Sequence, residues 1–192
     1  MVNEQRAGMS LPMALTWARM GLVPVCVFLF YLPLPWGRAA AAGVFVLAGL
    51  TDWLDGYLAR RWQQTSAFGA FLDPVADKVM VAVTLVLVVQ GAAGGTVALL
   101  TALAAMAIIA RELMVSALRE WMATRGARDE VAVSWLGKLK TAAQMVSLTL
   151  LLYGGPMLGL DSRTIGLPVL LLATVLAYAS MAGYVGAARR AG

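Results

Sequence analysis

Long runs of apolar residues, separated by short polar or glycine- and proline-containing breaks, dominate the chain. A helix needs about 17–25 such residues to cross a bilayer, and six runs reach that length. They cover residues 15–36, 38–60, 72–92, 95–121, 134–155 and 165–187. The breaks are short, so neighbouring helices are expected to form antiparallel hairpins. The pattern predicts an all-α protein with six transmembrane helices.

The six runs form one predicted domain, residues 15–190, and residues 1–14 are predicted to be an N-terminal interfacial arm or helix. The first run has one trait of a signal peptide, because Arg6 precedes its apolar core. However, Arg19 lies inside that run and five further runs follow. We therefore expect the first helix to be retained.

Composition supports the membrane assignment and limits the possible chemistry. Charged residues make up 13% of the chain, whereas soluble domains contain about 25%. The sequence has no histidine and a single cysteine, Cys26. The usual general base and the usual zinc ligand are therefore missing, and no disulfide can form within the chain. Any acid–base or metal chemistry must use carboxylates.

Positive charge gathers on one side of the six-helix arrangement. Of the 15 lysines and arginines, only Arg38 and Arg163 fall on the other side. Because cytoplasmic segments carry the excess of lysine and arginine, both termini are predicted to be cytoplasmic. The net charge of +5 comes from cations at the ends of apolar runs, so we predict no nucleic-acid partner.

Two aspartates and two small residues share a face at the cytoplasmic end of the second predicted helix. Asp52 and Asp55 are three residues apart, and Gly56 and Ala59 continue the same stripe. Residues with almost no side chain allow a ligand or another backbone to approach closely. This face is therefore a candidate binding surface.

The third predicted helix carries a second pair of acids near its cytoplasmic end. Asp73 and Asp77 are four residues apart and also share a face. Pro74 suits the first position of a helix, which would make Asp73 its N-cap. A hairpin of the second and third helices would bring all four aspartates together.

Four neighbouring carboxylates near hydrocarbon need positive charge. Each would cost about 2–3 kcal/mol there, and they would repel one another. Oxygen ligands without histidine or thiolate favour Mg²⁺, Mn²⁺ or Ca²⁺, and four of them suit a pair of ions about 4 Å apart. The alternative is a set of helix caps paired with Arg60, Arg61 and Lys78. Four acids within 26 residues, interleaved with glycines, favour the metal interpretation.

The acids belong to a longer motif, D-x2-D-G-x2-A-R-x8-G-x3-D-x3-D. Its eight fixed positions are all present: Asp52, Asp55, Gly56, Ala59, Arg60, Gly69, Asp73 and Asp77. On these residues the sequence resembles the CDP-alcohol phosphatidyltransferase family. The resemblance implies a six-helix membrane enzyme with a polar cavity facing the cytoplasm. It also implies two bound Mg²⁺ or Mn²⁺ ions, a homodimer, and a place in the bacterial inner membrane among lipids.

The resemblance also implies roles for individual residues. Asp52, Asp55 and Asp73 would hold metal, and Asp77 would be both a metal ligand and the general base. The substrate CDP-diacylglycerol would be bound by Thr16, Gly56, Arg60, Ser66 and Gly69.

A finer resemblance covers residues 15–19, 110–122 and 131–141, and it is to the branch of the family whose acceptor is glycerol 3-phosphate. Transfer of the phosphatidyl group to this acceptor gives phosphatidylglycerophosphate and CMP. A dianionic phosphate needs two or more cations, and the candidates are Arg111, Arg119, Lys138 and Lys140.

The geometry of an ideal helix constrains these four cations. Arg111 and Arg119 are about 12 Å apart along the helix and differ by ~80° around it, so both can face one cavity. Lys138 and Lys140 point in nearly opposite directions, and the sequence does not choose between them. The alternatives for these cations are salt bridges, of Arg111 and Arg119 with Glu112 and Glu120, or contact with anionic lipid headgroups.

Two other functions remain open at this stage. The same chemistry can serve another acceptor, such as inositol phosphate, inositol, serine or phosphatidylglycerol. A cation transporter would use the aspartates as an ion path, but such sites usually lie near the bilayer midplane or ring a pore. The mechanism is expected to be direct attack by the acceptor, and a covalent phosphatidyl-enzyme is the rival.

Overall fold

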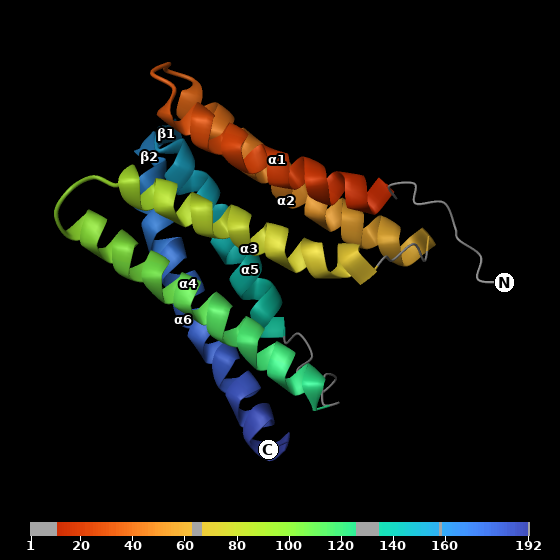
Figure 1. The fold of residues 1–192 in the computed structure, drawn as a ribbon. Helices are drawn as coiled ribbons and strands as arrows, with labels where there is room; N and C mark the ends of the chain where they lie inside the picture. Colours follow the sequence, from red (N-terminus) through yellow and green to blue (C-terminus); the bar gives the residue numbers. More distant parts are fainter. Residues whose placement is uncertain (1–10, 63–66, 126–134, 158, 192) are drawn as a thin grey trace. The chain divides into compact units, whose positions relative to one another are not determined.

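The computed structural model describes residues 11–62, 67–125, 135–157 and 159–191. These residues form six α-helices and two short strands (Figure 1). The helices are α1 Leu11–Tyr31, α2 Gly37–Trp62, α3 Ala67–Gln90, α4 Thr96–Thr124, α5 Trp135–Tyr153 and α6 Ser162–Ala191. The strands are β1 Pro156–Met157 and β2 Leu160–Asp161.

The helices follow the predicted apolar runs, except that α1 ends at Tyr31 instead of residue 36, and that α1 and α3 begin four and five residues earlier than predicted. Residues 11–14, predicted to belong to the N-terminal arm, form the first turn of α1, and residues 1–10 lie outside the described residues. α3 begins at Ala67 and Pro74 lies inside it, so the prediction that Asp73 caps this helix is wrong. Apolar residues before Asp73 extend the helix, and Pro74, its eighth residue, interrupts the backbone hydrogen bonds without ending the helix.

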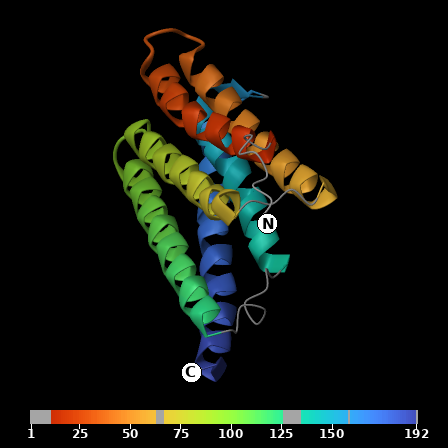
Figure 2. The same cartoon turned by 45° about the vertical axis from the view of Figure 1, so that its right-hand side comes forward.

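The chain divides into two compact units, residues 1–83 and residues 84–192. In the first unit α1 and α2 pack against each other as a hairpin (Figure 2). A Cβ at Gly37, where α2 begins, would lie 2.8 Å from the Leu29 carbonyl oxygen and 2.9 Å from that of Leu32. Backbone atoms cannot yield to a side chain there, so the tight turn requires glycine. Phe30 and Phe45 are among the buried residues of this hairpin.

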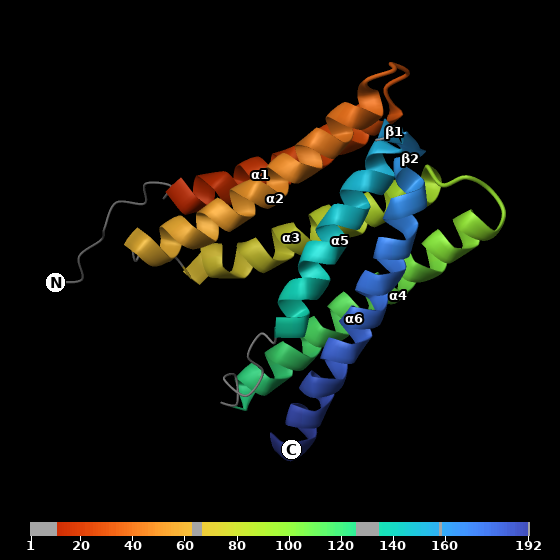
Figure 3. The same ribbon diagram turned by 180° about the vertical axis from the view of Figure 1, so that it is seen from behind.

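In the second unit α4 and α5 both pack against α6 (Figure 3). The antiparallel pair of β1 and β2 connects α5 to α6, and it was not predicted from the apolar pattern. Ser162 begins α6 and donates its hydroxyl to the Leu150 carbonyl, 2.8 Å away. Gly166 leaves room for Leu151, since a Cβ there would lie 2.8 Å from Leu151 Cγ. Together these contacts hold α5 and α6 close together.

Three stretches of the described residues are long and apolar enough to cross a membrane: Met13–Tyr31, Thr96–Thr124 and Ser162–Gly183. Large apolar side chains such as Phe28 and Val175 are each 65% exposed, as expected for residues that face lipid. α2, α3 and α5 do not meet the same criterion, and they carry the predicted aspartates and lysines. The six-span arrangement stays a prediction.

Candidate functional site

One face of α1 presents two buried polar side chains to the predicted acids. Thr16 is 1% exposed and Arg19 is 2% exposed. They are three residues apart, so they lie on the same side of the helix. Buried polar groups need hydrogen-bond partners, and both side chains find them among the aspartates of α2 and α3.

Arg19 joins Asp52 of α2 to Asp77 of α3. Its Nη1 donates to Asp77 Oδ1 at 2.6 Å and lies 3.0 Å from Asp52 Oδ1. Thr16 Oγ1 donates to Asp73 Oδ1. The structure therefore gathers three of the four predicted acids against α1. We refer to Asp52, Asp73 and Asp77 as the aspartate cluster.

The aspartate cluster is accessible to a ligand. The side chains of Asp52 and Asp77 are 45% and 43% exposed, although the arginine that holds them is buried. Carboxylates in such a position can bind a cation and can accept a proton from a bound hydroxyl. Among the described side chains, no three acidic or cysteine residues form a group that could hold a metal ion. The two-metal site therefore stays a prediction.

The remaining residues of the motif lie in segments whose side chains are not described. Ser66 is outside the described residues. Asp55, Gly56 and Arg60 belong to the described backbone of α2, and Gly69 belongs to that of α3. Their predicted contacts with metal or CDP-diacylglycerol stay predictions. Thr16 donates its hydroxyl to Asp73, and its predicted contact with the same substrate stays a prediction.

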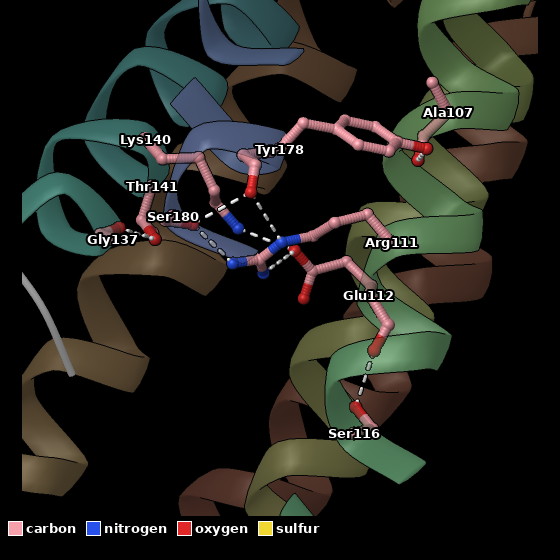
Figure 4. Close-up of polar contacts among 10 residues, drawn as sticks. Ala107, Arg111, Glu112, Ser116, Gly137, Lys140, Thr141, Tyr178 and Ser180 are labelled. Atoms are coloured by element: carbon pink, nitrogen blue, oxygen red, sulfur yellow. Dashed lines mark hydrogen bonds and ion pairs between the residues drawn. The ribbon is translucent and has the colours of Figure 1, made fainter. Parts of the chain in front are cut away.

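A second polar cluster lies in the other unit, on α4, α5 and α6 (Figure 4). Arg111 of α4 is 5% exposed. Its Nε donates to the Ala177 carbonyl at 3.1 Å, and its Nη2 donates to Ser180 Oγ at 2.7 Å. The third contact joins Nη1 to Glu112 Oε1 at 3.0 Å. Arg111 thus anchors α4 to α6.

Glu112 connects this arginine to α5. Lys140 is 7% exposed, and its Nζ donates to the same Glu112 Oε1 at 2.6 Å (Figure 4). Two cations therefore share one carboxylate, which leaves the group with one excess positive charge. Such an excess in a buried place favours the approach of an anion. We refer to Arg111, Glu112, Lys140 and Ser180 as the basic cluster.

The other two predicted phosphate ligands are exposed. Lys138 and Lys140 point in different directions as predicted, since Lys138 is exposed and Lys140 is buried. Arg119 is exposed as well, although Arg111, on the same helix, is buried. The predicted alternative of a salt bridge between Arg111 and Glu112 is confirmed.

Sequence reasoning missed three residues of these clusters. Arg19 was noted only as a charge inside the first apolar run, and Glu112 only as a salt-bridge partner. Ser180 had no role assigned. Arg19 left a usable signal, because an arginine in an apolar helix, three residues after a threonine, needs acids nearby. Ser180 left none, since serine is common where membrane helices pack.

The sequence is similar to known proteins along almost its entire length. A family model described as CDP-alcohol phosphatidyltransferase matches residues 9–185. A protein of Pectobacterium atrosepticum is 51% identical over 180 residues, which cover 94% of this chain and 95% of that protein. One of Escherichia coli K12 is 49% identical with the same coverage. Both relatives carry the name CDP-diacylglycerol–glycerol-3-phosphate 3-phosphatidyltransferase.

Proposed function

Because the chain belongs to the CDP-alcohol phosphatidyltransferase family, we propose that it is a membrane enzyme that transfers a phosphatidyl group from CDP-diacylglycerol to glycerol 3-phosphate. The observation that carries this conclusion is an identity of 49–51% to enzymes of that name, over 94% of the chain. Its products are phosphatidylglycerophosphate and CMP, which places the protein in phospholipid biosynthesis.

The reaction requires one proton transfer and one displacement at phosphorus. A hydroxyl oxygen of glycerol 3-phosphate bonds to the phosphorus next to diacylglycerol. The bond from that phosphorus to the bridging oxygen breaks, and CMP leaves with the electron pair. The hydroxyl proton passes to Asp77, which is the base in this proposal because the chain has no histidine. Its half-exposed carboxylate, held by Arg19, suits that role.

The donor set of the aspartate cluster fits a hard divalent cation. Asp52 and Asp77 each place an oxygen within 3.0 Å of one Arg19 nitrogen, and carboxylate oxygens are the ligands that Mg²⁺ and Mn²⁺ prefer. We propose that these two residues, with Asp55 and Asp73, bind two such ions. The bound ions would neutralise charge on the phosphoryl oxygens and on the departing CMP.

The remaining residues of the motif would bind the donor. In this proposal Gly56 and Gly69 give the nucleotide close access to the backbone, while Arg60 and Ser66 contact the headgroup. Thr16 is the weaker candidate for contact with the donor, and its hydroxyl also donates to Asp73, a proposed metal ligand.

The basic cluster is the proposed site for the phosphate of glycerol 3-phosphate. Lys140 is the main proposed contact, since its ammonium is held in a buried place together with an excess positive charge. Arg111 contributes charge, but three of its nitrogens already bind the protein. The exposed Arg119 and Lys138 would attract the anion before it binds.

The surroundings of the enzyme are part of the same proposal. The protein would cross the bacterial inner membrane six times, with both termini and the catalytic acids on the cytoplasmic side. It would act as a homodimer. Glycerol 3-phosphate is soluble and anionic, so a cytoplasmic active site gives it direct access.

Release of CMP by the purified protein tests the function. Release is expected only with CDP-diacylglycerol, Mg²⁺ or Mn²⁺ and glycerol 3-phosphate together, and not with inositol phosphate, serine or phosphatidylglycerol as acceptor. Asp77→Asn should abolish release, whereas Asp161→Asn, at an exposed acid in β2, should not. Ion flux in liposomes without CMP release would instead indicate a cation transporter. A phosphatidylated protein isolated without acceptor would contradict direct attack.

A further inference from the structure

Arg19 has an unusual position for a charged residue. It lies inside a stretch of α1 that is long and apolar enough to cross a membrane, and it is 2% exposed. Arginine in such a segment is costly unless it is paired or faces a polar site. Here both conditions hold, because its Nη1 contacts Asp52 and Asp77 at once.

We propose that Arg19 is the positioning residue of the aspartate cluster. Its guanidinium is the counter-ion that holds Asp52 and Asp77 together. A divalent cation bound by the same acids also neutralises part of their negative charge. The second half of this proposal rests on the metal site proposed above. The first half rests on the observed ion pairs alone.

The charges show why the acids need such a residue. Oδ1 of Asp52 and Oδ1 of Asp77 both lie within 3.0 Å of one nitrogen, so they are at most twice that distance apart. Two carboxylates this close repel each other strongly in a partly buried place. One buried guanidinium between them converts repulsion into two attractions.

The contacts also allow Arg19 and a cation to act together. Both ion pairs use Oδ1, and each carboxylate has a second oxygen that can face a metal ion. Thr16 completes the arrangement with a neutral donor to Asp73. α1 therefore supplies one positive charge and one hydroxyl to three acids, which orients them without filling every ligand position.

A rival role is direct binding of the anionic headgroup of CDP-diacylglycerol by Arg19. The two roles differ in the absence of substrate. A counter-ion stabilises the protein in the absence of substrate. If it is removed, binding of a divalent metal ion restores part of the lost stability. A headgroup ligand affects the KM for the donor and has no such effect on the stability of the substrate-free protein.

The experiment compares thermal unfolding of the full-length protein in detergent, without substrate, in EDTA and in excess Mg²⁺. Arg19→Met should lower the Tm in EDTA by at least about 5 °C, and Arg19→Lys should lower it less. Mg²⁺ should raise the Tm of Arg19→Met more than that of the wild type. The matched control is Arg163→Met, which removes a cation 3.9 Å from Asp161 and should leave the response to Mg²⁺ unchanged.

A double variant separates this proposal from the metal site. Asp52→Asn relieves the repulsion, so Arg19→Met with Asp52→Asn should be more stable in EDTA than Arg19→Met alone. That recovery supports the counter-ion role of Arg19, and it can be measured as purified yield if Arg19→Met does not fold. If Mg²⁺ stabilises no variant, only the proposed metal site is rejected. The proposal is overturned if Arg19→Met matches the wild type in EDTA, if Mg²⁺ stabilises both proteins by the same non-zero amount, or if Asp52→Asn gives no recovery.

Discussion

Lys140 and Lys138 lie two residues apart on α5 but in different surroundings, and replacing each by methionine should have different results. Lys140 is buried, with its Nζ 2.6 Å from Glu112 Oε1. Lys138 is exposed. Methionine retains most of the apolar stem of lysine and removes only the charge and the donors. The pair of variants therefore isolates the ammonium group in two settings on one helix.

The structure sets the expected size of the effect of Lys140→Met. Glu112 keeps its contact with Arg111 at 3.0 Å, so it loses one of two cationic partners. A hydrogen bond to a charged group contributes about 1.5–3 kcal/mol, and the side chain of Glu112 is 24% exposed, which favours the lower part of that range. A loss of about 2 kcal/mol corresponds to a Tm lower by roughly 4–8 °C.

The effect on activity should appear in the KM for glycerol 3-phosphate. If the ammonium binds the acceptor phosphate, losing about 1.5–3 kcal/mol raises that KM by roughly 10–150-fold. The KM for CDP-diacylglycerol should stay the same, because the residues proposed to bind the donor do not include Lys140. Lys138→Met should change both values by less than about twofold, as expected for an exposed charge.

CMP release measured over a range of glycerol 3-phosphate concentrations provides the assay, with far-UV circular dichroism to confirm folding. An unchanged KM for glycerol 3-phosphate in folded Lys140→Met would refute the assignment of Lys140. An equal rise in Lys138→Met would show that burial does not distinguish the two lysines.

Three further predictions concern the other contacts. Asp77→Asn should lower kcat by roughly 10²–10⁴-fold, whereas Asp161→Asn should leave kcat unchanged; a smaller loss of kcat in Asp77→Asn would assign the base elsewhere. In Arg111→Lys the single ammonium group cannot replace the three separate contacts of Arg111 to α6 and Glu112. Its Tm should therefore fall by more than that of Ser180→Ala, which removes one of these contacts, and the reverse order would contradict the anchoring role. EDTA should abolish CMP release, and Mg²⁺ or Mn²⁺ should restore it; full activity in EDTA would reject the metal site.

The helices could be predicted from the sequence because lipid imposes a simple requirement on length and polarity. An apolar run must be helical to satisfy its backbone, and its ends fall where polar residues, proline and glycine occur. α4 and α5 agree with the predicted runs to within three residues at each end. The start of α3 was wrong because Pro74 was expected to mark the first turn, whereas the apolar residues before it continue the helix.

The candidate site could be predicted only as far as spacing on single helices reaches. The shared faces of Asp52 with Asp55 and of Asp73 with Asp77 follow from helical periodicity. The link between Asp52 and Asp77 depends on Arg19, which comes from a third helix and more than 30 residues away in sequence. The ion pair of the buried Lys140 likewise joins α5 to Glu112 of α4. Such contacts between helices are set by packing, which a single sequence does not reveal.

The burial of Arg19 also has a consequence for how the protein is made. Synthesis proceeds from the N-terminus, so α1 is complete before Asp52 of α2 has been added to the chain. An isolated helix with an arginine in its apolar stretch enters the bilayer at a cost of up to about 2.5–3.5 kcal/mol, the value for an arginine at the helix centre. We therefore expect α1 to integrate stably only when α2 delivers its acid, with the two helices inserting as one hairpin during translation.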